Sequence, residues 1–252
     1  MAVDDIYTKS LLHFDGANGS TTFTDESGKT WTRTGSPTIS TVQKKFGSAS
    51  GLFNGSGEYI STPDHADLNF GSNDFTVDTW LRFSATPNSS GTGACQRIAS
   101  KGSINAENGS WCFGTYSDKI NFAYRIGGSI VDRFSSAILI GAGAWYHLAL
   151  VRTSGTIYFY LDGVSKGSAA CNETLTTTAT TTIATRAGTS QEYFPGNIDE
   201  FRISNGVARW TSDFTPPKWP YPVPSCYLQS RGRSRGSVGG SNSGISAQNS
   251  FL

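Results

Sequence analysis

Residues 145–168 read Trp145-Tyr-His-Leu-Ala-Leu-Val-Arg-Thr153, Ser154-Gly155, Thr156-Ile-Tyr-Phe-Tyr-Leu161, Asp162-Gly163 and Val164-Ser-Lys-Gly-Ser168. Three runs rich in β-branched and aromatic residues are joined by two-residue turns, a pattern that predicts a three-stranded antiparallel meander. Side chains alternate between the faces of a strand, so the middle run places Ile157, Phe159 and Leu161 on one face. Tyr158 and Tyr160 lie on the other. We expect the first face to enter the core and the second to be half exposed or to line a shallow groove.

Similar runs recur over most of the chain. The clearest is 74–83, Asp-Phe-Thr-Val-Asp-Thr-Trp-Leu-Arg-Phe, which alternates apolar and polar residues. Further strands are predicted at 10–15, 49–54, 59–61, 97–101, 110–116, 119–125, 130–134, 181–184 and 197–203. A helical period is absent, apart from one turn near 64–68. About a dozen short strands with turn signals every ~8–12 residues are typical of an all-β, two-sheet antiparallel sandwich or jelly roll.

The composition excludes several classes of partner. Only 15% of the 252 residues are charged, and 20 basic against 19 acidic residues leave a net charge of +1. Binding to nucleic acid or to an anionic membrane needs a strong positive field, so neither is expected. No apolar run is long enough for a transmembrane helix. The stretch Met1–Ile6 contains two acids and lacks the features of a secretory signal. This predicts synthesis and folding inside a cell, with removal of a leader as the alternative.

The organisation changes near the C-terminus. We predict an N-terminal arm at 1–9, a single domain at 10–214, and a Pro-rich linker with a Gly/Ser-rich tail at 215–252. The linker contains five prolines between Pro216 and Pro224. The tail carries residues expected to anchor a partner protein, namely Arg231, Arg233, Arg235, Phe251 and Leu252.

Four cysteines are scattered along the chain, at Cys95, Cys112, Cys171 and Cys226. No C-x-x-C pair is present, so neither a disulfide framework nor a zinc site is indicated. Because no export signal is seen, we expect four reduced thiols. Cys95 and Cys112 flank a predicted hairpin and are the pair expected to join if any bridge forms.

Several motifs, in order, resemble one family. They are Leu11-Leu-His-Phe-Asp-Gly16 with Ser20–Gly28, Phe46-Gly-Ser-Ala-Ser-Gly-Leu-Phe-Asn-Gly55, the 74–80 strand, Trp145–Arg152 with Tyr160-Leu-Asp-Gly163, and Gly196-Asn-Ile-Asp-Glu-Phe-Arg-Ile-Ser204 running on to Pro216. Together they resemble the laminin-G-like (concanavalin A-like lectin/glucanase) jelly-roll domains common in phage sequences. The match specifies the fold more than the function, because this fold hosts lectins, hydrolases, adhesion domains and scaffolding.

The resemblance implies two antiparallel sheets curved over one another, with the N- and C-terminal strands paired at one edge. It also implies a structural Ca²⁺ near that pairing, held by Asp15, a backbone carbonyl near Gly47, and Asp199. Carboxylate and carbonyl oxygens are the ligands that Ca²⁺ prefers. The alternative is that Asp15 and Asp199 cap turns or pair with Arg202.

Signs of an enzyme are weak. The hydrolase branch of the family carries a Glu-x-Asp-x-x-Glu run, and glycoside hydrolysis needs two carboxylates at a defined separation. No such run occurs here, and no Gly-x-Ser-x-Gly or phosphate-binding motif is present. The three histidines are His13, His65 and His147, and we expect His147 to be packed inside its strand rather than to act as a base or ligand. The sequence therefore predicts a non-enzymatic protein.

Glycan binding is consistent with exposed aromatic side chains beside polar loops. The candidates are Trp80, Tyr158 and Tyr160 on the non-core faces of their strands, and Tyr193 and Phe194 before the last strand. The alternative for each is ordinary packing against the sheet.

The sequence interpretation favours a structural protein of a phage virion, as a capsid decoration or a tail-associated protein. Its terminal segments would anchor a lectin-like sandwich to other virion proteins, with surface glycan as a further partner and homo-oligomerisation expected. A free-standing carbohydrate-binding lectin module is the alternative, and a glycoside hydrolase is the least favoured. The expected location is the virion, after synthesis in the host cytoplasm.

Overall fold

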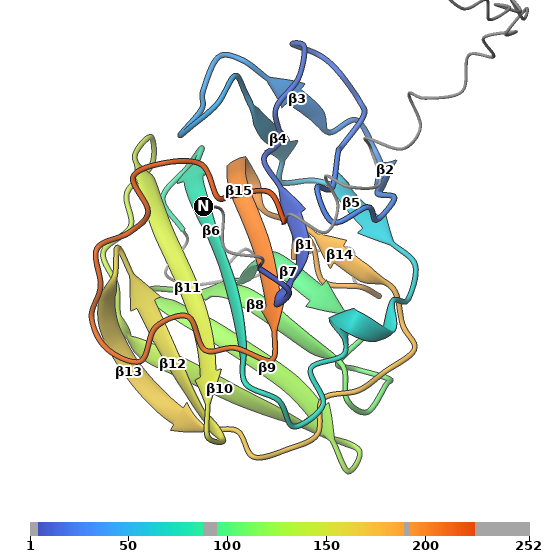
Figure 1. Cartoon of the computed structure of the whole chain (residues 1–252), viewed down its shortest axis with the longest axis vertical. Helices are drawn as coiled ribbons and strands as arrows, with labels where there is room; N and C mark the ends of the chain where they lie inside the picture. Colours follow the sequence, from blue (N-terminus) through green and yellow to red (C-terminus); the bar gives the residue numbers. More distant parts are fainter. Residues whose placement is uncertain (1–4, 88–94, 189–191, 225–252) are drawn as a thin grey trace, which may run out of the picture.

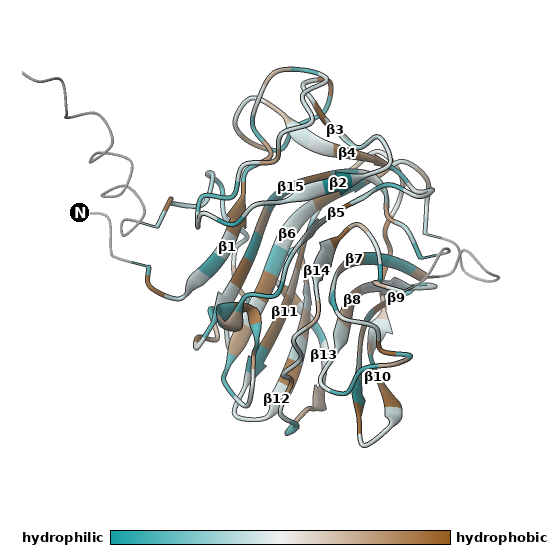
Figure 2. Cartoon of the chain, turned by 90° about the vertical axis from the view of Figure 1, so that its right-hand side faces the viewer, coloured by the Kyte–Doolittle hydropathy of each residue, from teal (hydrophilic) through white to brown (hydrophobic). Residues whose placement is uncertain are grey.

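The computed structural model describes residues 5–87, 95–188 and 192–224. Two antiparallel sheets pack face to face as two layers (Figures 1 and 2). The eight-stranded sheet has the order β13(Val164–Ala170), β12(Thr156–Leu161), β11(Trp145–Thr153), β6(Phe75–Phe83), β15(Pro195–Asn205), β4(Ser50–Asn54) and β3(Thr38–Ser40), with β1(Thr8–Leu12) paired to β15. The seven-stranded sheet has the order β10(Ser129–Ala137), β9(Lys119–Ile126), β8(Trp111–Tyr116), β7(Cys95–Lys101), β14(Thr181–Ile183), β5(Tyr59–Thr62) and β2(Thr32–Thr34).

These two sheets confirm the predicted all-β jelly-roll sandwich. Within the described residues the helical content is one short 3₁₀ turn, Ala66–Leu68, where the sequence predicts a single turn. None of the described helical structure has the length and apolar character needed to cross a membrane.

The meander at 145–168 forms as predicted. Strands β11, β12 and β13 pair in sequence order, with Thr153 opposite Thr156 at the first turn and Leu161 opposite Val164 at the second. The N-terminal strand β1 pairs with the last strand β15, as the resemblance implies, so the two ends of the domain close the same sheet.

The core fills the space between the two sheets. Ile157 and Phe159 are fully buried and Leu161 is nearly so, which confirms the core face predicted for the middle strand of the meander. Aromatic side chains from both sheets meet there: the ring centroids of Phe75 on β6 and Phe122 on β9 are 6.1 Å apart. Burial of apolar area on this scale is the main stabilising term of the domain.

The chain after β15 crosses the outer face of the eight-stranded sheet. We call residues 206–224 the C-terminal strap; its orange-to-red trace passes over this sheet in Figure 1. Trp210 and Phe214 of the strap stack on each other and pack against Val151 and Tyr160. Further along, Tyr221 is 4% exposed. Contacts with the domain therefore continue beyond Phe214, where the sequence places the domain boundary, and the remaining predicted tail residues lie outside the described residues.

The register corrects the expected cysteine pair. Strand β7 places Cys95 opposite Tyr116, and Cys112 opposite Ser100, so the two thiols do not face each other. Cys95, Cys112 and Cys171 are free, and Cys226 lies outside the described residues. The three described cysteines therefore agree with the expected reduced thiols. The register corrects only the choice of Cys95 and Cys112 as the pair that would join if a bridge formed, because they share no register position although their strands pair.

Candidate functional site

A groove with two tyrosines lies on the outer face of the seven-stranded sheet. Ile60 and Thr62 of β5 are buried, so the alternation turns Tyr59 and Ser61 to the outside. Tyr193, from the loop that leads into β15, lies beside Tyr59, with the two rings 21° from parallel and their centroids 6.5 Å apart.

The groove has a volume of about 350 Å³. Its walls are largely hydroxyl-bearing and aromatic, formed by Tyr59, Ser61, Thr180, Thr182, Thr185, Arg186, Ala187, Gly188 and Tyr193. Hydrogen bonds order its floor: the hydroxyls of Ser100 and Thr182 lie 2.7 Å apart, and Thr182 donates to the carbonyl of Thr185. The Ser100 hydroxyl also accepts from the amide of Ala187, which holds the rim loop to the sheet.

A buried ionic cluster positions Tyr193. The neighbouring Glu192 accepts from Arg97 at 2.7 Å through one carboxylate oxygen and from Arg186 at 2.8 Å through the other. Arg97, which is 3% exposed, also donates to the amide oxygen of Asn121 on β9. Because both Glu192 oxygens are bound by guanidinium groups, the tyrosine that follows is fixed relative to the sheet.

This arrangement can bind a sugar. Pyranose and furanose rings present C–H faces that stack on aromatic rings, and their hydroxyls exchange hydrogen bonds with Ser, Thr and Arg side chains. Of the predicted glycan-binding residues the groove contains Tyr193 alone. The sequence reasoning missed Tyr59, although its alternation with Ile60 was a usable signal for an outward-facing ring.

The other predicted aromatic residues lie elsewhere. Phe194 is fully buried and its ring packs on Phe83 in the core. Tyr160 is 1% exposed beneath Phe214 of the strap, with Tyr158 half-buried beside it. The expected shallow groove over β12 is therefore filled by the strap.

Trp80 lies on the outer face of the eight-stranded sheet and is 6% exposed. Its ring packs edge-on against Phe46 and His147. The ammonium group of Lys45 sits 3.7 Å from the centroid of the Trp80 ring, a cation–π contact. Trp80 and Tyr193 thus lie on opposite faces of the sandwich.

The three predicted calcium-binding residues meet at one loop, residues 45–49. Gly47 lies in the loop, and the Asp15 and Asp199 carboxylates bind its backbone amides. Asp199 of β15 accepts from the amides of Lys45 at 2.7 Å and Phe46 at 3.1 Å through Oδ2. Asp15 accepts from the amides of Ser48 and Ala49 through Oδ1. Gly47, between them, has φ +57° and leaves no room for a Cβ beside the Asp15 carboxylate. Both carboxylates therefore cap the loop, and neither hydrogen-bonds Arg202, which pairs with Asp78.

One carboxylate oxygen of Asp199 accepts no hydrogen bond from the described residues. This oxygen, Oδ1, is buried. Burial raises the pKa of Asp199 to about 7, against the opposing effect of the two loop amides, and the charges of Glu200 and Asp15 raise it further. A hard cation would match this oxygen. Among the described residues no three His, Cys, Asp or Glu side chains form a metal-binding group, so an ion here would need backbone carbonyls as well.

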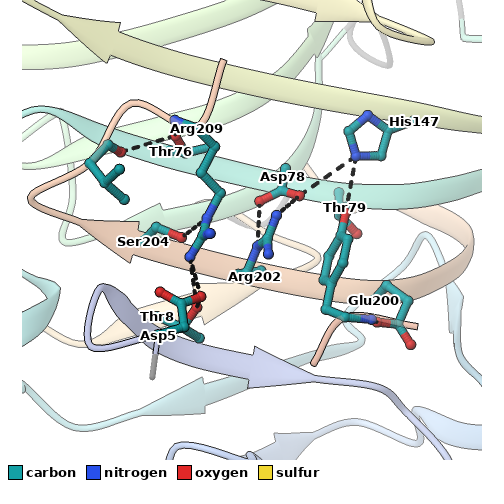
Figure 3. Close-up of polar contacts among 12 residues, drawn as sticks. Asp5, Thr8, Thr76, Asp78, Thr79, His147, Glu200, Arg202, Ser204 and Arg209 are labelled. Carbon is teal, nitrogen blue, oxygen red and sulfur yellow. Dashed lines mark hydrogen bonds and ion pairs between the residues drawn. The ribbon is translucent and has the colours of Figure 1, made fainter. Parts of the chain in front are cut away.

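A buried polar network ties the strap to the sheet (Figure 3). Arg202 of β15 forms a bidentate ion pair with Asp78 of β6, at 3.0 and 2.9 Å. His147 of β11 is fully buried, with Nε2 3.0 Å from the hydroxyl of Tyr221 and 3.6 Å from Asp78. The structure therefore places His147 inside the packed network, and the amide of Tyr221 donates to Glu200.

The fold defines a class of protein: a lectin-like jelly-roll domain with a sugar-sized groove on one face. The chain belongs to the concanavalin A-like lectin/glucanases superfamily, whose family model matches residues 54–211. No curated protein matches the sequence.

Solved structures with the same fold are binding domains of larger proteins. The binding domain of Paraclostridial Mosquitocidal Protein 1 is 14% identical with a TM-score of 0.61, over 81% of this chain and 50% of that one. The binding domain of botulinum neurotoxin serotype G is 15% identical with a TM-score of 0.55, over 88% and 51%. The chain thus spans about half the length of these toxin domains.

Domain 4 of AbnA, a GH43 extracellular arabinanase from Geobacillus stearothermophilus, matches at nearly full length. It is 18% identical with a TM-score of 0.59, over 80% of this chain and 94% of that one, and was solved in complex with arabinotriose. At these identities the likeness establishes the fold.

Proposed function

We propose that this chain is a non-enzymatic glycan-binding domain and that the Tyr59–Tyr193 groove holds the sugar. The observation that carries the proposal is the pair of near-parallel tyrosine rings above a floor of ordered hydroxyls. The described residues that line the groove include no carboxylate, and the nearby Glu192 is neutralised by two arginines. Glycoside hydrolysis requires a pair of available carboxylates, so the groove supports binding rather than hydrolysis.

Tyr193→Ala is expected to weaken binding of the best ligand on a glycan array by at least about tenfold, or ~1.4 kcal/mol, because the stacking surface is removed. Tyr59→Ala should act in the same direction, and Tyr193→Phe should retain binding because it keeps the ring. Short arabinan oligosaccharides are suitable first probes, since a domain of the same fold was solved with arabinotriose.

The matched control for this test is Tyr116→Ala. Tyr116 is 44% exposed on β8 of the same sheet and does not line the groove. Array signals that are equal for wild type, Tyr193→Ala and Tyr59→Ala would remove the groove from the binding site, and loss in the Tyr116 variant as well would indicate damage to the sheet.

We also propose a structural Ca²⁺ at the 45–49 loop. The unpartnered Oδ1 of Asp199, the Asp15 carboxylate and a backbone carbonyl near Gly47 would hold the ion, whose charge would offset the burial of Asp199. The ion would stabilise the loop and take no part in sugar chemistry.

The finer role that we propose is structural: the domain belongs to a phage virion, on the capsid or the tail, and is anchored by the residues after the strap. This proposal is supported by the motif resemblance and by the docked strap, which packs on the sheet opposite the groove-bearing one. Surface glycan would then be the ligand presented to the groove.

Deleting residues 225–252 is expected to leave the melting temperature within about 2 °C of wild type, because the contacts of Tyr221 with His147 and Glu200 that hold the strap lie before the deletion. The shortened protein should no longer be incorporated into particles, as measured by immunoblotting purified virions. Normal incorporation of the shortened protein would contradict anchoring by the tail.

A further inference from the structure

A second hollow lies on the opposite face of the sandwich from the tyrosine groove. It has a volume of about 510 Å³ and is lined by Lys45, Phe46, Trp80, Trp145, Asp162, Thr215, Pro216, Pro217 and Lys218. Five separate parts of the chain build it: the 45–49 loop, the two neighbouring strands β6 and β11, the β12–β13 turn, and the strap. Because the strap forms one wall, the hollow exists only when the strap is docked.

A cationic donor lies at this hollow without an ion-pair partner among the described residues. The ammonium group of Lys45 rests on the Trp80 ring, 3.7 Å from its centroid, and forms no ion pair within the described part of the chain. A ligand that supplies acceptor oxygens would give this ammonium group a charged partner.

The charge of the lining favours an anion. Lys45 and Lys218 contribute two positive charges against one negative charge from Asp162, whose Oδ1 accepts from the amide of His147 at 2.8 Å. Asp162 is therefore partly compensated by the backbone, and neither lysine forms an ion pair among the described residues. A carboxylate accepts charge-assisted hydrogen bonds from ammonium groups.

The walls favour a ring over an extended peptide. Flat apolar surfaces line the hollow on two sides. One is the ring of Trp145, which is half-buried on the same face as Trp80, and the other is the Pro216–Pro217 pair. Such surfaces match the C–H face of a sugar, and the exposed Thr215 adds a hydroxyl. This combination of apolar surfaces with two lysines differs from the tyrosine groove, whose described lining includes no lysine.

We propose that this hollow is a second, independent site that binds an acidic sugar residue, its carboxylate held by Lys45 and Lys218 and its ring placed against Trp145. The site takes a different class of glycan from the neutral sugar proposed for the tyrosine groove. The proposal for this hollow and the proposal for the tyrosine groove can be tested separately, because the two sites lie on opposite sheets and share no residue.

The test is calorimetric titration of the full chain with oligogalacturonate and with its methyl ester, which removes the negative charge and keeps the ring. Lys45→Gln is expected to weaken oligogalacturonate binding at least about tenfold, since it removes the charged donor. Lys44→Gln is the matched control: the same charge is lost from an exposed neighbour that does not line the hollow. Trp145→Ala, which leaves the buried Trp80 in place, should also weaken binding.

The proposal predicts that the methyl ester binds at least about tenfold more weakly than the acid, and that the Tyr59→Ala/Tyr193→Ala variant binds the acid as wild type does. It is overturned if Lys44→Gln and Lys45→Gln lose equal affinity, if the ester binds as well as the acid, or if poly-glutamate binds as tightly as oligogalacturonate. The last result would assign the hollow to acidic peptides.

Discussion

Arg202→Met is expected to lower the free energy of unfolding by about 3–5 kcal/mol, because it leaves the fully buried carboxylate of Asp78 without its ion-pair partner. The guanidinium group also lies 3.9 Å from the centroid of the Tyr221 ring, so the substitution removes a contact that holds the strap. Urea unfolding at pH 7, followed by far-UV circular dichroism, measures the effect.

The control for this prediction is the Asp78→Asn/Arg202→Met double variant. Removing the stranded charge together with its partner should make the double variant less destabilised than the sum of the two single variants. A single Arg202→Met variant within about 1 kcal/mol of wild type would contradict the account, since that is the range of exposed ion pairs.

The same ion pair predicts an acid limit to stability. Burial alone would raise the pKa of Asp78, but the Arg202 charge and the His147 hydrogen bond hold it well below its usual range. A lowered pKa means that the stabilisation is present above the pKa of the unfolded carboxyl and is lost as the pH falls.

Asp199 is expected to have the opposite effect on stability. Its pKa rises from 3.8 to about 7 in the folded protein, so the folded state binds a proton more tightly than the unfolded state. In EDTA, stability should therefore fall as the pH rises from about 4 to 7, by up to ~4 kcal/mol, at 1.36 kcal/mol for each pKa unit. Asp199→Asn should remove this dependence and raise the melting temperature at pH 8.

Calcium should reverse this loss. Because Ca²⁺ binds the ionised carboxylate, about 2 mM Ca²⁺ at pH 8 is expected to raise the melting temperature of wild type and to leave that of Asp199→Asn unchanged. Differential scanning fluorimetry at pH 5 and pH 8, with EDTA and with Ca²⁺, separates the two effects. A wild-type melting temperature that Ca²⁺ does not change at pH 8 would exclude the calcium proposal.

Local patterns were sufficient for the three-stranded meander, but they did not indicate the short strands β2 and β3. The meander at 145–168 was predictable because its turns and its alternation are contained in neighbouring residues. The pairing of Tyr59 with Tyr193 was not, since it depends on a loop reaching a strand far away in the sequence. The sequence identified Tyr193 as a candidate but gave no sign of which ring would join it.

The strap shows the limit of reasoning from composition. A Pro-rich segment cannot join a central strand, and the segment after Phe214 duly forms no strand in the part that the structure describes. Composition does not reveal, however, that Tyr221 reaches the buried Asp78–Arg202 pair through His147. Nor does it reveal that Phe214 of the strap packs on Tyr160, on the face where Tyr158 and Tyr160 were expected to line a groove.

The most direct test of the central claim is a crystal structure of the domain with the neutral oligosaccharide that binds it best. The account predicts a sugar ring within about 4 Å of the Tyr59 and Tyr193 rings, with its hydroxyls toward Ser61, Thr182 or Arg186. The claim would be contradicted if the neutral sugar bound elsewhere on the domain and the tyrosine groove held no sugar.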